Sequence, residues 1–183
     1  MKIIIFDDNL RVKSVVQNVY GITKKDVDSL EWSNGMMSNL SDNYTIQNDE
    51  FEIIIGNEID LSIVLPQIKE IYKSRVNNNV NNACFKGFVS GITGWGYETE
   101  YHDQTNFSRR MLTLLNDQDK TTVKWKTADG VVREHTREQF LGVCNELDEF
   151  ITSKVNAGWI IKNIDIENAS TLEELKSINL EVE

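Results

Sequence analysis

The stretch from Ala83 to Phe107, ACFKGFVSGITGWGYETEYHDQTNF, is the segment around which the rest of the chain is predicted to be organised. Glycine adopts positive φ without steric cost, so the glycines within GFVSGITGWG predict turns and close approach of the backbone. The aromatic residues beside them predict either a rigid surface patch or a small core. Asp103 is expected to begin a helix, because its carboxylate can accept free N–H groups of the next turn.

A long helix is predicted before this stretch, from Leu61 to Cys84. Its apolar residues recur at helical spacing and are Val64, Ile68, Ile71, Tyr72, Val76, Val80 and Cys84. Pro66 is tolerated near the first turn. The asparagines between residues 77 and 82 weaken the helix, because asparagine is a poor helix former.

A short helix and a hairpin are predicted after the stretch. The helix runs from Asp103 to about Leu115, and its apolar face consists of Phe107, Met111, Leu112 and Leu115. Ala128-Asp129-Gly130 separates two alternating runs, 121–127 and 131–135. An Asp-Gly pair in this setting is a strong hairpin signal.

Two more helices complete the C-terminal part. Thr136 and Gln139 form a capping box for a helix that is expected to end at about Trp159 or Ile164. Its apolar stripe consists of Phe140, Cys144, Leu147, Ile151 and Val155. A last short helix is expected after a cap at Ser170 or Thr171, with Leu172, Leu175 and Ile178 facing inward.

The N-terminal part is predicted to be rich in β-structure. Strands are expected at residues 2–6, 12–19, 44–46 and 51–55. The first two form a hairpin across Asp7-Asp8-Asn9. A short helix is expected between Thr23 and Trp32, followed by a segment of turn-forming residues up to Asn43. The predicted fold class is therefore α+β, with a small β-rich unit at 1–58 that docks to a partner and a mainly helical unit with inserted hairpins at 59–183.

Composition narrows the classes of partner. The formal net charge is −10 and the isoelectric point is about 4.7, so the chain lacks the basic footprint that nucleic acid or anionic lipid requires. We expect no nucleic-acid partner and no membrane partner. The apolar run Ile3-Ile4-Ile5-Phe6 ends at Asp7-Asp8, and it is too short for a signal peptide or a membrane span.

Few residues point to catalysis or metal binding. Cys84 and Cys144 are expected to be buried free thiols, His102 a surface or interface ring, and His135 a residue that helps to seat a helix start. A Cys-His enzyme that uses these residues with Asp103 is a weaker alternative. A hard-cation site at Asp7-Asp8 or Asp49-Glu50 is conceivable, although adjacent acidic pairs are usually solvated turns. We therefore expect no catalytic residue, no cofactor and no metal ion.

Aromatic residues are the strongest candidates for a binding surface, because aromatic side chains dominate interface hot spots. The candidate interface residues are Trp95, Tyr97, Tyr101, His102 and Phe107, to which Trp125 and Trp159 can be added. The alternative is that two or three of these rings close the helical unit's own core, since cores and interfaces use the same residue types.

The chain also carries an ordered series of short motifs. They are Cys84, Gly87-Phe88 with Ser90, Gly94, Tyr101-x-Asp103-Gln104-x-Asn106, Val123-Lys124-Trp125-Lys126, Asp129-Gly130, His135-Thr136, Gln139-Phe140 and Ala169-x-Thr171-Leu172-Glu173-Glu174-Leu175. Over roughly residues 60 to 180 this series resembles a C-terminal domain of unknown biochemical function in many bacteriophage and prophage tail proteins.

This resemblance implies a virion structural protein without enzyme activity, at the baseplate or the tail-fibre attachment region. Its partners would be other tail proteins, with a homotrimer as an open alternative. Its location would be the virion tail, after synthesis in the host bacterial cytoplasm. Two other functions stay open: a tail-fibre assembly chaperone that is absent from the finished particle, and a small cell-wall-degrading enzyme that uses His102, His135 or paired carboxylates.

Overall fold

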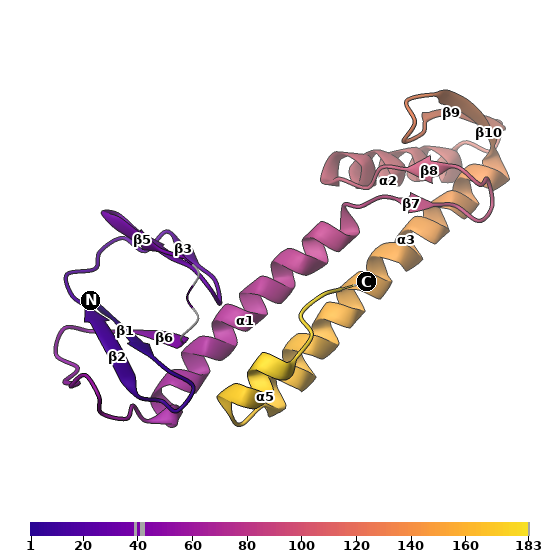
Figure 1. Ribbon diagram of the computed structural model, residues 1–183. Helices are drawn as coiled ribbons and strands as arrows, with labels where there is room; N and C mark the ends of the chain where they lie inside the picture. The colour runs from indigo at the N-terminus through magenta and orange to yellow at the C-terminus, as the bar shows by residue number, and fades with distance from the viewer. Residues whose placement is uncertain (39, 41–42, 183) are drawn as a thin grey trace. The chain divides into compact units, whose positions relative to one another are not determined.

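The computed structural model describes residues 1–38, 40 and 43–182. The predicted α+β class is confirmed, because small antiparallel sheets precede helices that alternate with hairpins (Figure 1). The described chain forms two compact units. The first consists of residues 1–78 and 159–181, and the second of residues 79–158 together with Val182. The domain boundary proposed between residues 58 and 59 stays a prediction.

In the first unit, the opening hairpin forms as predicted. Strands β1 (Lys2–Phe6), β2 (Val12–Val16) and β6 (Asn43–Gln47) make an antiparallel sheet in the order β2-β1-β6. The Asp7 carboxylate accepts the backbone N–H groups of Asn9 at 2.9 Å and Arg11 at 3.0 Å, which closes the turn. Strand β2 ends at Val16, earlier than the predicted Val19.

Two predictions for the first unit were wrong. The segment expected as a helix forms strands β3 (Lys24–Lys25) and β4 (Leu30–Trp32), and β4 pairs with β5 (Gly35–Met37). A turn forms instead of a helix because the Asp26 N–H donates to the Ser29 carbonyl at 2.8 Å and the β4 residue Leu30 is buried.

The strand expected at residues 51–55 is also absent. The Asn48 side chain accepts the Phe51 N–H at 2.8 Å, and residues 51–54 are irregular. Strand β5 lies in the segment up to Asn43 that was expected to hold turns alone. Positions 39, 41 and 42 of that segment lie outside the described residues.

Helix α1 (Leu61–Cys84) has the predicted bounds. The Asp60 carboxylate accepts the Ser62 N–H at 2.8 Å at its start. In the first unit, Ile71 of α1 packs in a core with Ile3, Ile5 and Tyr44. The polar asparagine run is helical as predicted.

The glycine-aromatic stretch forms a small hairpin and the start of a helix. Strands β7 (Phe88–Val89) and β8 (Gly96–Tyr97) pair antiparallel, and α2 (Tyr101–Asn116) follows. Helix α2 begins before the predicted Asp103. Glu100 is the N-cap, and Asp103, three residues later, accepts the Glu100 N–H at 3.1 Å.

The buried face of α2 also differs from the predicted one. Phe107 and Leu114 are buried, whereas Leu112 and Leu115 are exposed. The predicted face assumed that every apolar residue at helical spacing is buried, and the packing of the unit selects only part of that set.

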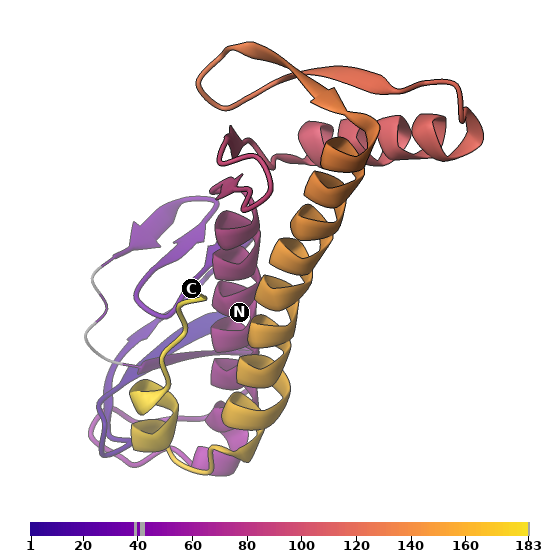
Figure 2. The ribbon, with the colours of Figure 1, turned by 90° about the vertical axis from the view of Figure 1, so that its right-hand side faces the viewer.

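The hairpin and capping box after α2 are confirmed. Strands β9 (Thr122–Lys126) and β10 (Val132–Thr136) pair antiparallel, and Figure 2 shows their hairpin alongside α2. Helix α3 (Arg137–Ile160) starts with reciprocal bonds, from the Thr136 N–H to the Gln139 side chain at 2.9 Å and from the Gln139 N–H to the Thr136 hydroxyl at 3.2 Å.

Helix α3 ends one residue after Trp159, one of its two predicted ends, but the helical run continues. A π-helical turn, η1 (Ile161–Asp165), continues α3 directly into α4 (Ile166–Asn168). Helix α5 (Leu172–Ser177) begins at Thr171, one of the two predicted caps, whose hydroxyl accepts the Glu174 N–H at 3.1 Å. Leu172 and Leu175 are buried, as predicted.

Gly87 is the glycine whose replacement should cost most within the glycine-aromatic stretch. It has φ of +76°, and an added Cβ would lie 2.6 Å from the Tyr97 carbonyl oxygen. Gly94 has φ of +72° with open space around it, so Gly94→Ala should cost only the conformational strain of about 1–2 kcal/mol. We expect Gly87→Ala to lower the free energy of unfolding by more than Gly94→Ala, as measured by urea denaturation. Equal losses would contradict this close approach.

Candidate functional site

The second unit is built on a cluster of aromatic rings. Phe107 of α2 lies 4.3 Å from Trp125 of β9 and 5.5 Å from Phe140 of α3, measured between ring centroids. Tyr97 of β8 lies 5.9 Å from Phe107. Tyr97 and Phe107 are 1% and 2% exposed. These two candidate interface residues therefore lie in the core, where their rings hold α2, α3 and two hairpins together.

His135 of β10 lies inside this cluster and is fully buried. Its Nδ1 lies 3.2 Å from the Arg133 carbonyl oxygen, which can only accept, so Nδ1 carries the hydrogen. Its Nε2 therefore accepts from the Tyr97 hydroxyl at 2.7 Å. Burial lowers the pKa of His135 below its ordinary value. The ring is a neutral link between β8 and β10.

The sequence prediction for His135 missed this role. His135 was expected only to help seat the start of α3. The signal that could have placed it is strand alternation, because His135 pairs with the buried Val123 in the hairpin and shares its face.

The loop between β7 and β8 is fixed to α3 by one carboxylate. The Ser90 hydroxyl donates to Glu146 Oε2, and the Gly91 N–H donates to Glu146 Oε1 at 3.0 Å. The Ser90 oxygen also accepts the N–H groups of Ile92 and Thr93, both at 3.2 Å. The Ser90 hydroxyl is therefore used in holding the loop.

Trp95 in the same loop is half-buried and contacts two side chains of β10. Its ring meets His135 edge-on at 5.0 Å, and the Arg133 guanidinium lies 5.2 Å from its ring centroid. Asp129 pairs with Arg133 at 2.7 Å, and this pairing holds the pKa of the Asp129 carboxyl well below its usual range. Trp95 thus contacts both a buried ring and a cation of the same strand.

Three of the candidate interface residues are exposed: Tyr101 and His102 of α2, and Trp159 near the end of α3. Tyr101 is 66% exposed and meets Phe85 edge-on at 4.7 Å. The His102 ring lies 3.5 Å from Glu100 and 3.2 Å from Asp103, measured to their carboxylate oxygens. Both residues lie in the first turn of α2.

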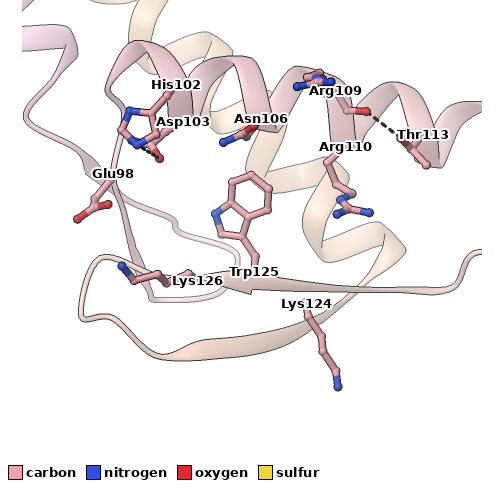
Figure 3. Close-up of a pocket in the computed structure, with 10 residues that line it drawn as sticks. All are labelled: Glu98, His102, Asp103, Asn106, Arg109, Arg110, Thr113, Lys124, Trp125 and Lys126. Carbon is pink, nitrogen blue, oxygen red and sulfur yellow. Dashed lines mark hydrogen bonds and ion pairs between the residues drawn. The ribbon is translucent and has the colours of Figure 1, made fainter.

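His102 also lines a groove that has a volume of about 540 Å³ and lies between α2 and β9. Figure 3 shows the Trp125 ring pointing from β9 toward α2, Arg110 extending from α2 toward β9, and Lys124 pointing away from α2. The lining residues are Glu98, His102, Asp103, Asn106, Arg109, Arg110, Thr113, Lys124, Trp125 and Lys126.

The basic side chains of this groove were not singled out from the sequence. Arg109, Arg110, Lys124 and Lys126 lie within eighteen positions of a chain whose net charge is −10. That local concentration of positive charge was the available signal. The groove brings them beside His102 and Trp125, two residues that the sequence did single out, whereas Tyr97 and Phe107 do not line it.

The thiols and the acidic pairs considered for chemistry have structural surroundings. Cys84 and Cys144 are free and buried, as predicted, and burial raises the pKa of the Cys144 thiol to about 12. Asp8 pairs with Lys176, and Asp49 pairs with the N-terminal amine at 3.0 Å. In the part of the chain that the structure describes, no three or more His, Cys, Asp or Glu side chains gather as a metal site would require.

The region that contains these residues matches a known protein family. Residues 67–179 match the family described as a domain of unknown function, DUF4376. The chain belongs to this family. No curated protein and no solved structure matches the chain. The DUF4376 range includes the aromatic cluster, the loop held by Glu146 and the groove. It agrees with the stretch of roughly 60 to 180 over which the motif series runs.

No helix in the described part of the chain combines the length and the apolar character that a membrane span needs.

The neutral state of His135 predicts a pH dependence of stability. Its folded-state pKa is lowered, so the unfolded state binds a proton first as the pH falls below about 6.5. The contribution of this residue is fully present above that pH and is lost as the pH falls through the folded-state pKa. We expect the stability of the native protein relative to the His135→Gln variant to be smaller at pH 5 than at pH 7.5, measured by urea denaturation.

An identical acid dependence for His135→Gln and the native protein would contradict a buried neutral ring.

Proposed function

We propose that this DUF4376 protein is a non-enzymatic structural component of a bacteriophage tail, or of a phage-derived tail particle, at the baseplate or the fibre attachment region. The motif series that resembles phage tail proteins supports the setting. Support for a structural role comes from the side chains of the second unit, and in particular from how its reactive groups are used.

The observation that carries the proposal is that three groups suited to nucleophilic or acid–base chemistry, Ser90, His135 and Cys144, are engaged in packing and hydrogen bonds. Ser90 is bonded to Glu146, and His135 lies in the core bonded to Tyr97. The Cys144 thiol is buried with a raised pKa, which opposes thiolate formation. A catalytic nucleophile needs an accessible atom beside a base, and these residues instead stabilise one rigid unit.

A scaffold of this kind offers two surfaces for assembly. In the first unit, β2 and β6 are the outer strands of a three-stranded sheet, and outer strands can pair with a strand from a neighbour. In the second unit, the exposed Tyr101 and His102 lie beside the groove between α2 and β9. Under this proposal each unit contacts a different tail protein.

The test is mass spectrometry of purified, intact tail particles, with the copy number measured against the tube protein. We expect the chain at a stoichiometry that is a multiple of three or six, because baseplates and fibres have such symmetry. Absence of the chain from finished particles would overturn the structural proposal.

A tail-fibre assembly chaperone is the alternative that the same sample distinguishes. A chaperone would be absent from particles but present in a complex with unassembled fibre. It would also be required for soluble fibre on co-expression. Recovery of soluble fibre without this chain, together with its presence in particles, would exclude that alternative.

A further inference from the structure

Strand β9 forms one wall of the groove. It pairs with β10, and the groove is lined by residues of α2 and β9 together with Glu98, and by none from β10. The side chains that this wall supplies are Lys124, Trp125 and Lys126.

Both walls of the groove, α2 and β9, carry basic side chains that the protein itself leaves unpaired. Within the fully described residues 79–158, several basic side chains form no ion pair or hydrogen bond: Lys86, Arg109, Arg110, Lys120, Lys124 and Lys126. All of these except Lys86 and Lys120 line the groove. In contrast, Arg133 and Arg137 of the same unit are bonded to Asp129 and to backbone carbonyls.

The charge is not uniform along the groove. Glu98 and Asp103 lie at the start of α2, whereas Arg109 and Arg110 lie about two turns further along. Seven residues of helix from Asp103 to Arg110 span about 10 Å. A nucleic acid carries a phosphate at every nucleotide and would place negative charge against Glu98 and Asp103. A peptide can place its acidic residues at the arginine end alone.

The length of the groove matches a short extended segment. From His102 to Thr113 the helix rises about 16 Å, which corresponds to about five residues of a β-strand. The half-buried Trp125 ring lies between the two walls (Figure 3). It offers an apolar surface to such a segment.

We propose that this groove binds an extended, acidic peptide segment of a partner protein, which lies along the groove and places its carboxylates against Arg110 and Lys126. Arg110 reaches from α2 and Lys126 lies on β9, so the acidic side chains would meet a basic group on each wall. This inference rests on the proposed function in taking the partner to be a protein, and it adds the chemistry of that partner.

The test is fluorescence anisotropy with the full chain and a labelled peptide, acetyl-Thr-Val-Glu-Thr-Glu-Val-amide. The control peptide replaces both glutamates by glutamine. We expect the acidic peptide to bind about tenfold more tightly than the glutamine peptide, because two ion pairs are lost in the latter.

The variant Arg110→Glu/Lys126→Glu should weaken binding of the acidic peptide by about tenfold or more. The matched control, Lys86→Glu/Lys120→Glu, makes the same change in net charge outside the groove and should bind as the native protein does. Arg109→Glu/Lys126→Glu changes two exposed groove residues, and it replaces the first variant if Arg110→Glu impairs folding.

Several results would overturn the proposal. One is equal weakening by the groove variants and the matched control. Another is tighter binding of a single-stranded oligonucleotide than of the peptide at physiological salt, or a dimer in sedimentation that the groove variant abolishes. These measurements use the isolated chain, so they can fail while the tail-particle experiment succeeds, and the reverse also holds.

Discussion

The hydrogen bond between the Tyr97 hydroxyl and His135 Nε2 is the interaction on which the second unit depends. It joins β8 to β10 inside the core, where an unpaired polar atom would cost about 1–3 kcal/mol. The aromatic rings of α2 and α3 pack around it. Because both bonded groups are buried, we expect β8, β10 and the helices beneath them to form together. The groove beside β9 is built on these same elements.

The parts of the fold that depend on local chemistry could be predicted from the sequence. The Asp129-Gly130 turn and the Thr136–Gln139 capping box form as expected, because each is decided by residues close together in the chain. The segments that failed depend on distant contacts. Strands β3 and β4 replace a predicted helix where Leu30 enters the core, and no local pattern reveals that burial.

The candidate site shows the same division. Aromatic residues between Trp95 and Phe107 were recognised as important, but the sequence does not separate a core ring from an interface ring. Only the structure places Tyr97 and Phe107 inside and Tyr101 outside. The groove between α2 and β9 forms only when the fold brings these two elements together, so its basic residues could not be assigned to one site from the sequence. These basic residues can be recognised as a site only when the fold shows which of their side chains stay unpaired.

The π-helical turn at Ile161–Asp165 has a consequence for comparing relatives. A π-helical turn holds one more residue than the α-helical geometry that surrounds it, so the side chains after it are rotated by about 100° relative to an uninterrupted α-helix. The buried Ile166 owes its orientation to that extra residue. A relative that is one residue shorter between 161 and 165 would turn the same face inward with a straight helix, so an alignment gap at this point is compatible with an unchanged fold.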